Sequence, residues 1–175
     1  DFYRLISSKD EYLASKVVLN VPVFECSEIF LDEDIKNYYK KFEFYDQSAF
    51  VIYLKIDSQK EFLNHYQIIL KDNIPNSLSN SFFVSFSHKD DRKIKKNGYS
   101  VTISSHTKAL FWNNLSKDEY ETKKEFTTKF IIDELLKNIS DIKKEDIKTE
   151  FSAISKTFKR YINRYNGGAT PLNLK

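Results

Sequence analysis

In three stretches of the chain, every second side chain belongs to one set and the side chains between them to another. These stretches are residues 47–57, 81–87 and 99–106. Successive side chains of a β-strand point to opposite faces, so a period of two residues predicts a strand. One set is apolar in each stretch: Phe50, Ile52, Leu54 and Ile56, then Phe82, Val84 and Phe86, then Tyr99, Val101 and Ile103. The chain is therefore expected to build a sheet that buries one face.

The opposite face of the third stretch is rich in hydroxyl groups. It carries Ser100, Thr102, Ser104 and His106. Antiparallel sheets commonly pack one face on a core and leave the other exposed, which produces this division. A loop that ends in Asn97-Gly98 separates the second stretch from the third, and this predicts that the two strands pair antiparallel.

Other segments give a less regular pattern. Residues 65–70 (HYQIIL) predict a further strand, and residues 16–22 (KVVLNVP) predict a buried strand that Pro22 ends. Residues 147–154 fit either a strand or a helix, and residues 27–44 fit one helix or two short ones.

The clearest helix signal is Ser116 followed by Glu119, the spacing of a capping box. The apolar side chains that follow predict one wide buried helix face that ends near Asn138 or Ser140: Phe126, Phe130, Ile131, Ile132, Leu135, Leu136 and Ile139. Residues 157–165 predict a short helix stopped by Gly167-Gly168. Strands come first and helices follow, so the expected fold is α+β, with a mostly antiparallel sheet of about five strands packed against helices.

Composition excludes several classes of site. The sequence has three glycines, too few and too scattered for a dinucleotide fingerprint or a phosphate-binding loop. One cysteine, Cys26, and three scattered histidines give no zinc pattern, and we expect no metal ligands. Lysines alternate with acids and the net charge is only +3, so no nucleic-acid partner is expected. No apolar run approaches the 18 residues of a membrane span.

Isolated side chains leave alternatives open. His106 could be a proton donor, could contact a substrate or could only be satisfied by a neighbouring backbone group. Trp112 could line a pocket or fill the core. Cys26 is expected to be a small buried thiol. A single cysteine fits a reducing compartment, and we expect a cytoplasmic protein.

Several phrases resemble the phytoene desaturase-like FAD-dependent oxidoreductases, the family of carotenoid desaturases and isomerases. Residues 98–139 contain VTISSHT, then the pair Phe111-Trp112, then Tyr120 and Lys124 in the helix. The family has a similar order of a VTISTHT-like phrase, an aromatic-Trp pair and a Y-x-x-x-K helix. Residues 16–24 (KVVLNVPVF), 63–70 (LNHYQIIL), 82–100 (FFVSFSHKDDRKIKKNGYS) and 157–172 (TFKRYINRYNGGATPL) resemble further family segments in the same order.

The resemblance implies a substrate-binding domain without its flavin site. Residues 1–25 would be the link from an FAD-binding domain and residues 26–175 the substrate domain. The glycine-rich flavin segments of the family are missing, and Thr170-Pro171-Leu172 stands where its last motif has a second glycine. FAD would be bound by the rest of the same protein, and this chain would be inactive alone.

The same resemblance implies an apolar substrate, such as a polyene. The residues expected to line its site are Tyr53, Ser85, Ser104 and His106; no catalytic residue is expected. Members of the family often meet membranes to collect such substrates, so a membrane-peripheral position is an alternative to a fully cytoplasmic one. The sequence contains no methionine, which fits an internal segment of a longer protein.

Two other functions remain open from the residues alone. One is a standalone, non-catalytic interaction domain with the same fold. The other is a small lipid-binding domain, because an apolar pocket also accommodates acyl chains.

Overall fold

The computed structural model describes residues 2–88, 91, 98–169 and 172–174. The chain forms two compact units, Asp1–Phe42 and Glu43–Lys175. The predicted Asn97-Gly98 turn lies outside the described residues, apart from Gly98 itself.

The first unit contains a hairpin and two short helices. Strands β1 (Tyr3–Ile6) and β2 (Glu11–Ala14) pair antiparallel, and helices α1 (Val23–Ile29) and α2 (Glu33–Tyr39) follow. The side chain of Asp32 caps α2 by accepting from the backbone amides of Asp34 and Ile35. The alternative of two short helices is thus confirmed, although the first begins before residue 27.

The predicted strand at residues 16–22 is wrong. This segment is neither strand nor helix, and the side chain of Val18 is 91% exposed. β-Branched residues favour a strand when they pack against neighbours on a pleated surface, and no strand pairs with this segment among the described residues. Pro22 stands at the start of α1 instead. Cys26 is buried, as expected, and burial raises the pKa of its thiol.

The second unit is built on a five-stranded antiparallel sheet with the order β5-β6-β7-β4-β8, which confirms the α+β prediction. Its strands are β4 (Ser48–Asp57), β5 (His65–Ile69), β6 (Ser81–Phe86), β7 (Gly98–Thr107) and β8 (Ile147–Ala153). The expected pairing of the second and third alternating stretches is confirmed as β6 against β7. The ambiguous segment 147–154 is a strand that forms one edge of the sheet.

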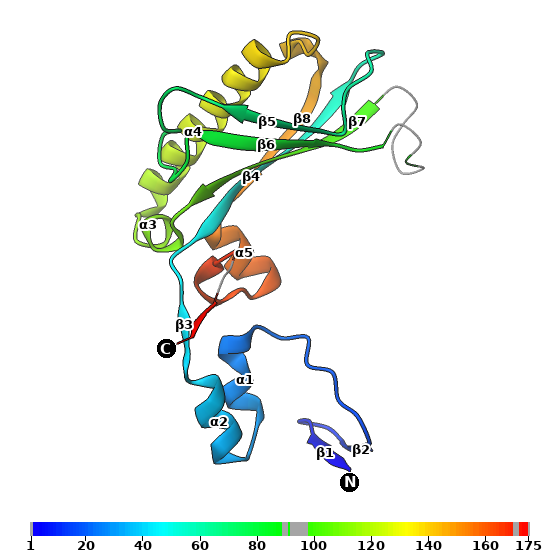
Figure 1. Ribbon diagram of the computed structural model, residues 1–175, viewed down its shortest axis with the longest axis vertical. Coiled ribbons are helices and arrows are strands. Elements are labelled where there is room, and N and C mark those ends of the chain that lie inside the picture. The colour runs from blue at the N-terminus through cyan, green and yellow to red at the C-terminus, as the bar shows by residue number, and fades with distance from the viewer. Residues whose placement is uncertain (1, 89–90, 92–97, 170–171, 175) are drawn as a thin grey trace. The chain divides into compact units, whose positions relative to one another are not determined.

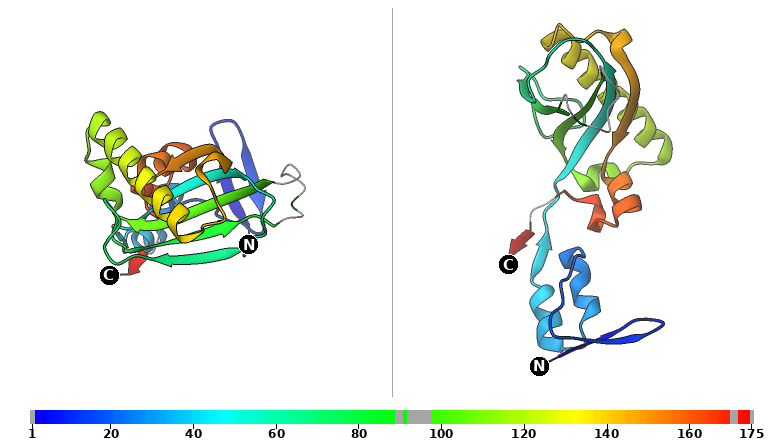
Figure 2. Two further views of the ribbon diagram at one scale, coloured as in Figure 1. Left: turned by 90° about the horizontal axis from the view of Figure 1, so that it is seen from above. Right: turned by 90° about the vertical axis from the view of Figure 1, so that its right-hand side faces the viewer.

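Helix α4 (Lys117–Asn138) lies across one face of this sheet (Figures 1 and 2). Its predicted capping box is present: Ser116 Oγ accepts from the backbone amide of Glu119, and the Glu119 carboxylate accepts from that of Ser116. The helix buries Ile131 and Leu135 against the apolar sheet face. Phe126, expected in that buried face, is 59% exposed because it lies off the contact stripe.

The short helix α3 (Ala109–Asn113) carries Trp112 into the same core, with no exposed surface. Its indole Nε1 donates to Thr107 Oγ1 at 2.8 Å, and the Thr107 hydroxyl donates to the carbonyl of Asn76 at 2.8 Å. The core interpretation of Trp112 is therefore confirmed. A 3₁₀ turn, Lys144–Asp146, leads from α4 to β8.

Helix α5 (Ser155–Ile162) ends earlier than expected. Asn163 adopts the left-handed conformation with φ 48° and terminates the helix before the two glycines. A 3₁₀ turn, Tyr165–Gly167, follows and brings Gly167 next to Ser48. The Ser48 Oγ donates to the Gly167 carbonyl at 2.7 Å. The glycines thus position the segment after the helix and do not stop it.

The strands that lead into and out of this unit pair with each other. These are β3 (Phe42–Phe44) and β9 (Leu172–Leu174), which form a two-stranded sheet. Nearby, the backbone amide of Ala169 donates to the carbonyl of Gln47 at 3.0 Å. No helix among the described residues is long and apolar enough to cross a membrane.

Candidate functional site

The face of the sheet opposite α4, called the open face below, is the candidate site. Cross-strand pairs place two rows of side chains on it, since paired residues of an antiparallel sheet share a face. The first row, from edge to edge, is His65, Ser85, Thr102, Tyr53 and Phe151. The second row is Gln67, Phe83, Ser104, Val51 and Ala153.

All four residues predicted to line a substrate site lie on the open face. Tyr53 and Ser85 belong to the first row, and both flank Thr102 of β7. Ser104 is in the second row, between Phe83 and Val51. His106 lies further along β7, opposite Ala49. Residues that are far apart in the sequence are therefore neighbours on one surface, and Tyr53 is the one of the four that lines the groove described below.

Two histidines form polar contacts on this face. His65 Nδ1 lies 3.2 Å from Ser85 Oγ, and the His65 ring stacks on Phe83 with centroids 5.3 Å apart. His106 Nδ1 lies 3.0 Å from Gln47 Nε2. The partner of His106 is thus a side-chain amide and not the neighbouring backbone group that was one of the alternatives. Neither histidine has a carboxylate among these contacts, so nothing here forms a catalytic triad.

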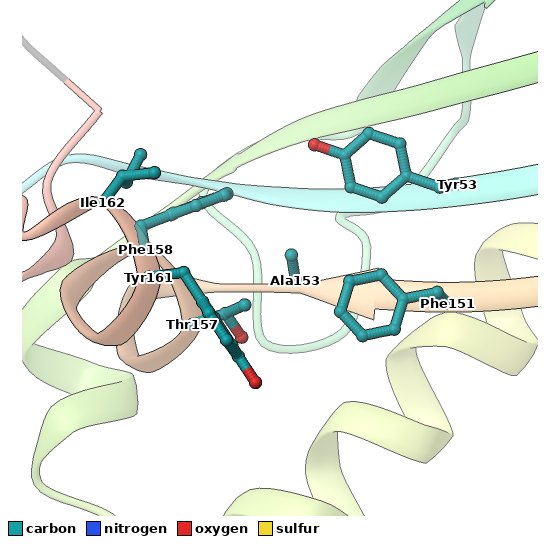
Figure 3. A pocket seen from close by; sticks show the side chains of 7 residues that line it. All are labelled: Tyr53, Phe151, Ala153, Thr157, Phe158, Tyr161 and Ile162. Carbon is teal, nitrogen blue, oxygen red and sulfur yellow. The ribbon is translucent and has the colours of Figure 1, made fainter.

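A groove of about 310 Å³ opens at the β4–β8 side of the open face (Figure 3). Its lining residues are Tyr53, Phe151, Ala153, Thr157, Phe158, Tyr161 and Ile162. One wall comes from the sheet, where the rings of Tyr53 and Phe151 stack with centroids 6.2 Å apart. The other comes from α5, which presents Phe158, Tyr161 and Ile162. The volume is at the lower end of the range for small-molecule sites.

The walls of the groove are almost entirely apolar. Thr157 is the one short hydroxyl side chain, and its Oγ1 already accepts from the amide of Ile154 at 3.4 Å. Burial raises the pKa of the neighbouring Tyr120 phenol, and the proximity of Thr157 offsets part of that rise. Tyr120 therefore stays protonated in neutral solution, and Thr157 has its hydroxyl engaged within the protein.

Two lysines lie beside the groove. Lys156 Nζ donates to the carbonyl of Leu115 at 2.8 Å and lies 4.9 Å from the Tyr120 ring centroid. Lys124 Nζ lies 5.8 Å from the same ring and 5.9 Å from that of Phe151. A third cation lies beside the α5 wall, where the Arg160 guanidinium is 5.3 Å from the ring centroid of Tyr161. Positive charges thus lie against aromatic rings on both sides of the groove.

The α5 wall was missed at the sequence level. Phe158, Tyr161 and Ile162 belong to a segment that was assigned to a helix but not to a site. Phe151 was missed because residues 147–154 had no assigned secondary structure, so the face of each side chain could not be deduced. Its signal was the alternation of Thr149, Phe151 and Ala153, which the pairing with β4 makes meaningful.

The described residues do not fit the nucleotide part of FAD. A dinucleotide needs glycines where the backbone approaches its pyrophosphate at a helix N-terminus. The space beside Gly167 is filled by the backbone of Ser155, and that beside Gly168 by the ring of Phe44. Both glycines therefore serve packing within the unit. Nor do the described residues bring together three His, Cys, Asp or Glu side chains that could hold a metal ion.

The chain matches no protein-family profile and no curated protein sequence.

Proposed function

We propose that this chain supplies the substrate-binding domain of an FAD-dependent oxidoreductase similar to the phytoene desaturases. The observation that carries the proposal is the open face, a sheet surface that α5 covers at one corner, with hydroxyl groups at its centre and an apolar groove at one side. FAD would be held by other parts of the same protein. The residues of this chain would bind and orient an apolar substrate, for example a polyene, and the cofactor would accept its hydride.

Exposure of aromatic side chains supports a binding role for the open face. Tyr53 is 42% exposed, Phe83 39% and Phe151 51%, although each belongs to the regular part of a strand. Tyr53 and Phe151 stack on each other, and exposed apolar surface of this kind often meets a ligand or another protein surface. Burying it against an apolar chain would stabilise a complex by roughly 25 cal/mol for each Å² removed from water.

The pairing of β3 with β9 gives separate support. Segments that lead into and out of the sheet unit lie side by side. Domains whose two ends meet in this way are well suited to insertion within another domain, because the host chain needs little rearrangement. This is the arrangement expected if an FAD-binding domain both precedes and follows the unit.

The first test is flavin content. We expect the longer protein encoded by the reading frame around this chain to retain FAD through gel filtration, and the 175-residue chain to retain none. Adding an apolar polyene without oxygen should then bleach the flavin absorbance of the longer protein. A longer protein free of flavin, or tight flavin binding by the 175-residue chain itself, would overturn the proposal.

A pair of variants tests whether the open face binds the substrate. Tyr53→Asp places a charge beside the groove and should slow flavin reduction without changing the FAD content. Phe126→Asp makes a comparable change at an exposed ring on α4, outside the open face, and should leave the reduction rate unchanged. Equal effects of the two variants would argue against the open face.

Lipid binding is the second candidate, and the apolar groove is the observation that favours it. An acyl chain would use the same rings of Tyr53, Phe151 and Phe158. Flavin content separates the two candidates, because a lipid-binding domain needs no redox cofactor.

A further inference from the structure

Lys124 lies at the rim of the apolar groove with its charge directed at aromatic rings. We infer that the groove binds an apolar chain that ends in a carboxylate, with the chain against the rings and the carboxylate paired with Lys124. This rests on the proposed function only in taking the groove as the place where the substrate binds. It adds the chemical class of the ligand: a long-chain carboxylic acid.

The position of Lys124 follows from the helix and the sheet edge. Tyr120 and Lys124 are four residues apart in α4, so they share one face of the helix, and the Lys124 ammonium lies 5.8 Å from the Tyr120 ring centroid. The same ammonium reaches the edge strand β8, 5.9 Å from the Phe151 centroid. Phe151 is part of the groove wall (Figure 3). The charge of Lys124 therefore lies beside one of the rings that line the cavity.

Lys124 has no carboxylate partner among the described residues. The ion pairs there involve other cations, namely Arg4, Lys36, Lys55, Lys60 and Lys137. Neither Glu121, one turn earlier in α4, nor Glu150 of β8 pairs with Lys124. Its neighbour Lys156 differs, because the Lys156 ammonium already donates to the carbonyl of Leu115. Lys124 is therefore the cation that an anionic ligand would meet at the sheet edge beside Phe151, whereas Arg160 lies at the α5 wall, 5.3 Å from the Tyr161 ring centroid.

The groove itself offers a carboxylate little else. The Thr157 hydroxyl accepts from the amide of Ile154, the phenol groups of Tyr53 and Tyr161 are the other polar groups of the lining, and the rest of the wall is hydrocarbon. A charged group buried there without a partner would be strongly unfavourable. The favourable arrangement is an apolar chain inside and a charge at the rim, which matches the chemistry of a long-chain acid.

The test uses a fluorescent polyene carboxylic acid, cis-parinaric acid, and its methyl ester as probes of the 175-residue chain. A partly exposed ion pair with a carboxylate contributes modestly, so we expect the acid to bind about three- to tenfold more tightly than the ester. Lys124→Gln should reduce acid binding to the level of the ester and leave ester binding unchanged. Lys124→Arg keeps the charge and should keep most of the preference.

Lys129→Gln is the matched control. It removes one positive charge from an exposed position of the same helix, away from the groove, and should leave both affinities unchanged. Equal affinity of the wild-type chain for acid and ester would overturn the inference, as would equal losses in the Lys124 and Lys129 variants. Binding of neither probe would overturn it too. Flavin retention by the longer protein tests the proposed function separately and does not depend on this result.

Discussion

Gly167 occupies a position where the backbone conformation and the neighbouring atoms leave no room for a side chain. Its φ is +68°, and a Cβ there would overlap the backbone of Ser155. A left-handed conformation costs an L-residue about 1 kcal/mol or more, and the overlap adds to that because backbone atoms cannot move aside as a side chain can. Gly167→Ala should therefore lower the denaturant midpoint of the chain clearly, as measured by circular dichroism during urea unfolding.

Gly168 provides the control for this prediction. Its φ is negative, and a Cβ there would meet the ring of Phe44, a side chain that can turn. Gly168→Ala should cost less than Gly167→Ala. If the two substitutions shift the midpoint equally, the constraint lies in the loss of glycine flexibility in general and not in the contact with Ser155.

Residue-scale prediction from the sequence worked where the pattern had a period of two. Alternation placed Tyr53, Ser85 and Ser104 on one face before any strand order was known, because each side chain follows its own backbone. The hydrogen-bond partners of these side chains could not be predicted from the sequence. The pairing of His106 with Gln47 joins residues 59 positions apart, and only the strand order brings them together.

At the scale of elements, the start of α4 carries a pH dependence. Hydrogen bonds from the Ser116 hydroxyl and the Ser116 backbone amide lower the pKa of Glu119. The folded-state pKa is below the unfolded one, so the stabilisation is present above the ordinary carboxyl range and is lost as the pH falls through the folded-state pKa. Glu119→Gln should flatten the acid limb of the plot of stability against pH, measured by urea unfolding between neutral and acidic pH.

Glu125→Gln is the comparison for that experiment. Glu125 lies in the same helix, beyond its first turn, and has no part in the capping box. Its removal should leave the acid limb as it is in the wild-type protein. If the acid limb is as steep in both variants as in the wild type, the titration of Glu119 does not contribute to the pH dependence of stability.

The strands at residues 48–57 and 98–107 were predictable because each has an unbroken alternating pattern of about ten residues. Residues 16–22 show why composition alone fails. Val17, Val18 and Leu19 suit a strand, yet a strand also needs a partner, and a partner is a property of the fold and not of the segment. The hairpin of β1 and β2 was not predicted at all, since its side chains are largely exposed and leave no buried face to recognise.

At the scale of the whole molecule, one layer of helix on one face of a sheet explains why a candidate site exists. The α+β class followed from the order of strands and helices, but the existence of an uncovered face did not, because it depends on where α4 and α5 pack. The groove arises for the same reason: α5 follows directly on β8 and turns across only one corner of the open face.

The core of the second unit draws on that unit alone. Every side chain of the main buried cluster lies between Phe50 and Ile154. In the described part of the first unit, the only buried apolar side chain is Cys26. A fragment of residues 43–175 should therefore keep a cooperative urea transition, whereas residues 1–42 alone should show none, because so short a segment buries too little apolar surface to offset chain entropy.

Comparing midpoint and slope makes this last prediction decisive. The slope of unfolding free energy against denaturant scales with the surface exposed on unfolding, so the fragment 43–175 should retain most of the slope of the full chain. Its midpoint should change little, since no core side chain is removed. A broad, non-cooperative transition of the fragment would mean that residues 1–42 complete the fold of the sheet unit. The geometry of the open face would then depend on both units.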